Sequence, residues 1–342
     1  VADIVVSAYD SVNAYIDKFD TDGDGSLDPD ERELMFTDMK DKAATYITDF
    51  FKGTMQSIGG MLLSAVFIKQ TAGLAFAGMH PVVAVYATFL NRAFDQVLLD
   101  VALHKAGVTF VLDRAGITGD DGASHNGIWD LALTGIVPTL RVAAPRDGER
   151  VRETLREALD ISDAPTLIRF PKGAVNPDIP AFERRDGIDV LYRGESADIL
   201  LVSIGTFAQV AVDAAAQAYR EGVGVTVIDP RWVKPLPKSL VTMAQRYKRV
   251  VVIEDGIKHG GIASTISELF RESGLNVPVH SIGVPLEFLE HAKRAQILED
   301  LGITVQNITR SLVTWSSDEF SVDTKEEMPL PLDENEHRKP LR

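Results

Sequence analysis

Residues 199–229 read ILLVSIGTFAQVAVDAAAQAYREGVGVTVID. An uncharged, largely apolar run (residues 199–205) is followed by an amphipathic stretch (209–220) and then by a second apolar, β-branched run (223–229). A parallel strand covered on both faces has no polar side, so it reads as a continuous apolar run rather than as an alternating one. The stretch therefore predicts a strand, a helix and a second strand parallel to the first.

The same alternation extends from this stretch in both directions. It predicts an α/β protein with two doubly wound parallel-sheet domains. We expect these domains at residues 72–182 and 197–315, separated by a polar linker at residues 183–196. An α-helical extension (1–52), an apolar junction (53–71) and a disordered acidic tail (316–342) complete the expected organisation. The further apolar runs are residues 81–89, 108–113, 250–255 and 277–283, and the further amphipathic stretches are 92–104, 148–159 and 260–272.

The composition excludes several classes of protein. The chain has 342 residues and no cysteine, which excludes disulfides and thiolate metal sites. A net charge of −15 argues against nucleic-acid binding. The N-terminus lacks the pattern of a signal peptide, so we expect a cytoplasmic protein. The uncharged run at residues 54–68 is shorter than the ~20 residues that span a bilayer. A buried helix is its simpler interpretation, and membrane contact is the alternative.

Residues 20–31, DTDGDGSLDPDE, match the EF-hand calcium loop position by position. Gly25 stands at the sharp turn of this loop, and oxygen donors stand at the ligand positions. The alternative is a solvated acidic turn, and we find one such loop where these loops usually work in pairs. The predicted metal ligands are Asp20, Asp22, Asp24, Ser26 (through its carbonyl), Asp28 and Glu31.

A second group of polar residues follows the apolar run 108–113. Arg114 should lie at the carboxyl end of a strand, where open α/β sheets bind their ligands. Arg114 and Lys172 are cations beside glycine-containing turns, which suits a phosphate. Asp121 and His125 flank a Gly-Ala-Ser turn, where a carboxylate can hold a hydroxyl and a histidine can exchange protons. These residues predict a sugar-phosphate site.

From about residue 72 to residue 315 the chain resembles the 1-deoxy-D-xylulose-5-phosphate synthases, which are transketolase-type enzymes that depend on thiamine diphosphate. The segment DRAGITGDDGASHNGIWDL (113–131) is the most specific. The other matching segments are GLAFAGMHPVVAVYATFLNRAFDQ (73–96), RVAAPRD (141–147), RFPKG (169–173), DPRWVKPLP (229–237) and EDGIKHGGIAS (254–264).

The resemblance implies roles for individual residues in the substrate site. Tyr86, Arg114 and Lys172 match the positions that hold the phosphate of glyceraldehyde 3-phosphate. Lys172 replaces an arginine seen in many members, so it offers a point charge rather than a fork. Asp121 matches a contact to a substrate hydroxyl. His125 matches a proton-transfer histidine.

The resemblance also implies the cofactors thiamine diphosphate and Mg²⁺. Phe89 matches the aromatic residue that stacks on the aminopyrimidine ring, and Arg92 matches a neighbouring cation. The family's first domain, which binds the diphosphate through magnesium, has no counterpart in this sequence. Its activating glutamate falls where the chain reads LLSAV (62–66), with Ser64 at that position. The triplet Gly-Asp-Gly (23–25) resembles a diphosphate signature but lacks its following asparagine, and we assign it to the calcium loop.

The resemblance implies the condensation of pyruvate with glyceraldehyde 3-phosphate in isoprenoid precursor synthesis, with an incomplete active site in this chain. A homodimer, or a partner chain that supplies the diphosphate-binding domain, would complete the site. Two alternatives remain: the β-type subunit of a 2-oxo-acid dehydrogenase-like complex, and a non-catalytic calcium-binding protein. A natural fusion, a degenerate homologue and a sequence joined from two genes are all compatible with these residues.

Overall fold

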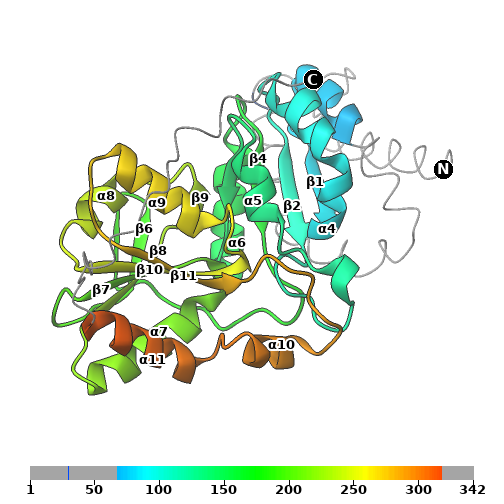
Figure 1. Cartoon of the computed structure of the whole chain (residues 1–342). Helices are drawn as coiled ribbons and strands as arrows, with labels where there is room; N and C mark the ends of the chain where they lie inside the picture. The colour runs from blue at the N-terminus through cyan, green and yellow to red at the C-terminus, as the bar shows by residue number, and fades with distance from the viewer. Residues whose placement is uncertain (1–29, 31–67, 318–342) are drawn as a thin grey trace, which may run out of the picture.

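The computed structural model describes residue 30 and residues 68–317. The calcium loop predicted at residues 20–31 therefore lies outside the described residues, except for Asp30. The described chain forms two α/β units that lie side by side, each built on its own sheet (Figure 1). None of the helices in residues 68–317 is both long and apolar enough to cross a membrane.

The first sheet has five strands in the order β1-β2-β4-β3-β9. Its first four members run parallel. The sequence TFVLD of β2 is buried at all but its last position, as expected for a strand covered on both faces. The strands are β1 (Val82–Tyr86), β2 (Thr109–Asp113), β3 (Arg141–Ala143), β4 (Thr166–Arg169) and β9 (Trp232–Lys234).

Helices cover both faces of this sheet. In α6 (Gly148–Leu159) the N-cap carboxylate of Asp147 accepts a hydrogen bond of 2.8 Å from the amide of Arg150. The same helix buries Leu155 and Ala158 against β3 and β4. The other helical elements of this unit are α4 (Ala87–Leu90), η1 (Asn91–Ala93), the π-helix η2 (Gln96–Ala102), η3 (Ala123–His125) and α5 (Asp130–Gly135).

The second sheet has six strands in the order β11-β10-β7-β8-β6-β5. Strands β11, β10, β7 and β8 run parallel, and β7, α7 and β8 form the strand–helix–strand unit predicted from residues 199–229. Helices α7 and α11 pack together on one face through small and apolar side chains. The elements are β7 (Ile199–Ser203), α7 (Ala208–Arg220), β8 (Val225–Asp229), α8 (Ser239–Ala244), β10 (Arg249–Ile257), α9 (Ile262–Glu272), β11 (Val279–Val284), α10 (Arg294–Asp300) and α11 (Val305–Ser317).

The polar linker expected at residues 183–196 is wrong for most of its length. Strands β5 (Glu183–Arg185) and β6 (Ile188–Tyr192) form a hairpin, and β6 pairs antiparallel with β8 at the edge of the second sheet. Ile188 and Val190 are buried in the core, while Asp189 is buried against arginine partners. The segment is polar in composition because its strands lie at the edge of the sheet, where Arg185 and Arg193 are exposed and pair with Glu183.

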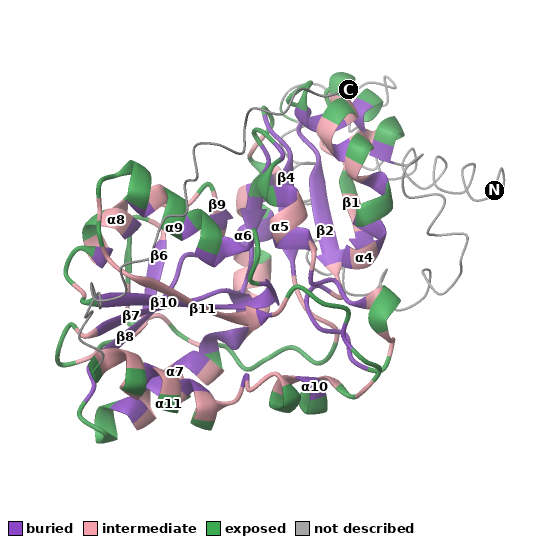
Figure 2. Ribbon diagram, viewed as in Figure 1, coloured by how far each residue is buried: buried purple, intermediate pink, exposed green. Residues whose placement is uncertain are grey.

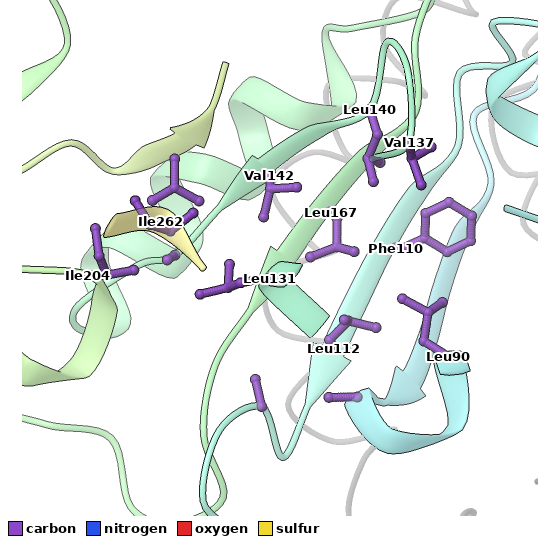
Figure 3. Packing of buried hydrophobic residues seen from close by; sticks show 14 of the residues in the cluster. Leu90, Phe110, Leu112, Leu131, Val137, Leu140, Val142, Leu167, Ile204 and Ile262 are labelled. Atoms are coloured by element: carbon purple, nitrogen blue, oxygen red, sulfur yellow. The ribbon is translucent and has the colours of Figure 1, made fainter. Parts of the chain in front are cut away.

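The two units share a continuous core. Figure 3 shows Leu131 of α5 between side chains of the first sheet, such as Val142 and Leu167, and Ile204 and Ile262 of the second unit. Strand β9 also leaves the second unit and pairs antiparallel with β3. Figure 2 shows buried residues along the strands of both sheets. The units are therefore fixed to each other by packing and by a shared strand.

Candidate active site

The candidate site lies where β1 and β2 end. Tyr86 and Asp113 are register partners at the last positions of these parallel strands. Arg114 follows at a φ of 60°, and this left-handed turn directs the chain away from the sheet. Gly116 and Gly127 then exchange backbone hydrogen bonds of 2.9 and 2.8 Å, which close residues 117–126 into a loop. We call residues 117–126 the site loop; it carries Asp121 and His125.

Two cations converge on the carboxylate of Asp121. Lys172 Nζ lies 2.7 Å from Asp121 Oδ1, and Arg114 Nη1 donates to Asp121 Oδ2. The guanidinium of Arg114 also lies 4.3 Å from the ring centroid of Tyr86, a cation–π contact. Partial burial alone would raise the pKa of Asp121, but the hydrogen bond from Lys172 and the charge of Arg114 together lower it. The structure thus brings together four of the predicted substrate residues.

An aromatic group adjoins these charges. The rings of Tyr86 and Phe89 lie 5.2 Å apart, and the ring of His125 lies 6.2 Å from Phe89 at an angle of 64°. His125 Nδ1 is 3.0 Å from Ser124 Oγ, and Thr88 Oγ1 donates to the carbonyl of Ser124 over 2.8 Å. These contacts connect the site loop to α4, so the predicted cofactor aromatic and the predicted proton-transfer histidine are neighbours.

Arg92 does not join the group. It lies in η1, is exposed, and forms no ion pair with a residue in the described range 68–317. The sequence reasoning also missed Asp113, whose Oδ1 accepts a 2.7 Å hydrogen bond from the amide of Arg114. Burial raises the pKa of Asp113. Its position at the end of an apolar run is the signal that could have identified it.

A cavity of about 580 Å³ opens beside Lys172. It lies between the segment 170–178 and the beginning of α6, and Asp113 and Lys172 are on its wall. Thr206, from the second unit, closes part of it. Lys172 therefore borders a space large enough for a small phosphorylated substrate.

Family models match both units. Residues 66–177 match the transketolase pyrimidine-binding domain, and residues 189–308 match the transketolase C-terminal domain. The chain carries two domains of the transketolase family. Among curated relatives, 1-deoxy-D-xylulose-5-phosphate synthase of Mycobacteroides abscessus is 55% identical over 251 residues, which is 72% of this chain and 39% of that protein. The enzyme of the same name from Mycolicibacterium vanbaalenii is 57% identical over the same shares.

Solved structures agree with this family. A chain described as "Split gene transketolase, inactive beta4 tetramer" aligns with a TM-score of 0.63 and 28% identity, over 72% of this chain and 80% of that one. Transketolase from Campylobacter jejuni aligns with a TM-score of 0.58 over 68% of this chain and 35% of that one; at 17% identity it supports the fold alone. The transketolase-type fold and the resemblance seen in the sequence are confirmed.

The chain spans about 39% of the length of the curated relatives that it matches. Both family models lie within residues 66–308, so neither reaches the EF-hand-like loop at residues 20–31. Calcium binding there stays a prediction.

Proposed function

We propose that the chain contributes the acceptor-substrate half of a thiamine-diphosphate-dependent 1-deoxy-D-xylulose-5-phosphate synthase-like site. The acceptor would be glyceraldehyde 3-phosphate, and the donor would be pyruvate. The observation that carries this proposal is the convergence of Arg114 and Lys172 on Asp121 at the carboxyl end of the first sheet. The identity of 55% to synthases of this name over both domains supports it.

Each residue of the group has a distinct part in this proposal. Arg114 presents a planar fork of donors and Lys172 a point charge, so together they can neutralise a phosphate dianion. Asp121 lies between these cations and can accept a hydrogen bond from a substrate hydroxyl. Tyr86 holds the Arg114 guanidinium against its ring face. His125, beside Phe89, is placed to exchange a proton with the reacting substrate.

The described residues fit one end of the cofactor. When bound, thiamine diphosphate supplies the electron sink for decarboxylation and carbon–carbon bond formation. Phe89 offers an aromatic ring for its pyrimidine, although this ring is buried in the core group. Within residues 68–317 there is no group of three or more His, Asp or Glu side chains that could hold a metal ion. We therefore propose that Mg²⁺ and the diphosphate are held elsewhere.

We propose that the site is completed by assembly, either with another copy of this chain or with a partner chain that carries a diphosphate-binding domain. The relative described as a split-gene transketolase is titled an inactive beta4 tetramer. That protein matches this chain over 80% of its own length, so a chain of similar span is a precedent for a separate subunit. A cytoplasmic location would suit such an enzyme.

Substitution of Arg114 by alanine should weaken phosphate binding roughly 10- to 100-fold, because a hydrogen bond to a charged group contributes about 1.5–3 kcal/mol. The measurement is calorimetric titration of the full chain with glycerol 3-phosphate, a stable analogue of the acceptor. Arg271→Ala is the matched control, because Arg271 is an exposed arginine on α9. Equal affinity in the wild type and Arg114→Ala, or no binding by the wild type, would contradict the proposed site.

We also propose that residues 20–31 bind Ca²⁺. Glu31→Gln should weaken calcium binding roughly tenfold or more, because it removes the charge of the bidentate ligand. Asp30→Asn is a matched control, since it removes one negative charge at a loop position that supplies no ligand. Calcium titration of the wild type, Glu31→Gln and Asp30→Asn measures the three affinities. Equal affinities would mean that the loop is a solvated acidic turn.

A further inference from the structure

The site loop lies directly against the second unit. The amide of Ile117 donates to Asp255 Oδ1 over 3.0 Å, and Arg294 Nη1 donates to the carbonyl of Ile117 over 2.6 Å. Arg294 Nη2 also lies 2.7 Å from Asp255 Oδ2. Both backbone polar groups of one loop residue are thus held by an ion pair that belongs entirely to the second unit.

A second contact lies nearer to the carboxylate of the site. His291 Nε2 donates to the carbonyl of Asp120 over 2.8 Å, next to Asp121 in the chain. The apolar side chain of Ile117 is fully buried in one cluster with Leu289 and Ile297, which flank His291 in the second unit. Polar and apolar contacts therefore fix both ends of the segment that leads to Asp121.

Two glycines show how closely the loop packs against the second unit. A Cβ atom on Gly116 would lie 2.2 Å from the carboxylate of Asp255, and one on Gly119 would lie 2.5 Å from the amide nitrogen of Arg294. Both glycines have a φ near +76°, which other residues rarely adopt. The loop can approach Asp255 and Arg294 this closely only because residues 116 and 119 have no side chain.

Asp255, which the site loop contacts, is held rigidly in the second unit. The Asp255 side chain is 3% exposed and lies on β10, which is buried along its whole length. The carbonyl of Asp255 accepts a 2.8 Å hydrogen bond from Arg169 of β4, whose Nε lies 2.7 Å from Asp130. The position of Asp255 is therefore set by the packing of both units and not by the loop.

We propose that Asp255, His291 and Arg294 are positioning residues for the acceptor site. They hold residues 117–120 so that Asp121 meets Arg114 and Lys172, and so that His125 stays beside Phe89. None of the three contacts those cations or rings in the structure, and each acts through loop backbone or through another member. The inference rests on the proposed function only for the statement that the loop serves phosphate binding.

The test is Arg294→Gln in the full chain, with Lys293→Gln as the matched control because Lys293 is an exposed neighbour of equal charge. Amide hydrogen exchange should become at least about fivefold faster at Ile117, Thr118, Gly122 and His125 in Arg294→Gln, while amides of β10 stay unchanged. Affinity for glycerol 3-phosphate should fall roughly fivefold. Arg294→Lys should recover part of both effects, because it retains one charged contact.

The outcomes separate this inference from the proposed function. Unchanged exchange in the loop of Arg294→Gln would overturn the inference, as would an equal acceleration in β10, which would indicate general destabilisation. Faster loop exchange with unchanged affinity for glycerol 3-phosphate would also overturn the positioning role. If the wild type fails to bind glycerol 3-phosphate, the proposed function is wrong, and hydrogen exchange alone still decides whether Arg294 holds the loop.

Discussion

The chain on its own should give no measurable turnover with pyruvate, glyceraldehyde 3-phosphate, Mg²⁺ and thiamine diphosphate. Residues 68–317 contain no cluster that could hold the metal, and the resemblance implies that Ser64 takes the position of the family's activating glutamate. A single proton-transfer group is typically worth about 10²–10⁴ in rate. Loss of the glutamate together with the diphosphate site should therefore reduce the rate below detection.

The measurement is a coupled assay of the purified chain, repeated after addition of a separately produced chain that carries a transketolase-type first domain and its glutamate. Activity should return only in the mixture, and it should fall again when the 342-residue chain in that mixture carries Arg114→Ala. Robust turnover by the 342-residue chain alone would contradict our account of an incomplete site.

Replacement of Arg146 by methionine should lower the free energy of unfolding by about 3–5 kcal/mol, the usual effect of removing one partner from a buried charge network. Arg146 is fully buried, and its Nη1 lies 2.7 Å from carboxylate oxygens of both Asp189 and Asp229. Its remaining donors bond to the carbonyl of Ile179. Methionine fills similar volume but leaves two buried carboxylates without this cation.

The loss should depend on pH. Burial raises the pKa of Asp229 to about 6 in the folded protein, although the charge of Arg146 opposes this rise. Without Arg146 the folded pKa rises further above the unfolded value. A raised folded pKa means that stability is present at low pH and is lost as pH increases through that pKa. The penalty of Arg146→Met should therefore be larger at pH 8 than at pH 5.

Urea denaturation at pH 5 and at pH 8 measures the loss of unfolding free energy and its dependence on pH. Arg152→Met is the control, because Arg152 is 54% exposed and forms only a surface pair with Glu149. It should change the free energy of unfolding by less than about 1 kcal/mol. An equal effect of the two substitutions, or a larger penalty for Arg146→Met at pH 5, would show that Arg146 does not hold these carboxylates.

The strands predicted from the sequence were those with long apolar runs. β2, β7, β8 and β10 are buried on both faces, so composition alone identifies them. The three-residue strand β9 has no such signature. It forms because β3, distant in the chain, offers an edge, and because Lys234 Nζ caps the carbonyls at the end of α5. Neither the edge of β3 nor the contacts of Lys234 with α5 can be predicted from the local sequence of β9.

The candidate site also contains residues that the sequence predicts and residues that only the tertiary packing reveals. Arg114, Asp121 and His125 were predicted because the segment 113–131 carries all three, and Lys172 was predicted as a second cation beside a glycine-containing turn. Arg92 came with the same resemblance but lies outside the group. The contacts of Asp255 and Arg294 with the site loop were not predicted, because they depend on how the two sheets pack against each other. No sequence spacing connects those residues to Ile117.

The most direct test of the central claim is a crystal structure of the full chain with glycerol 3-phosphate. We predict the phosphate at the carboxyl end of β2, within hydrogen-bond distance of the Arg114 guanidinium and the Lys172 ammonium. A phosphate bound instead at the arginine-lined cleft of Arg185, Arg193 and Arg246, with the Arg114 group empty, would contradict it.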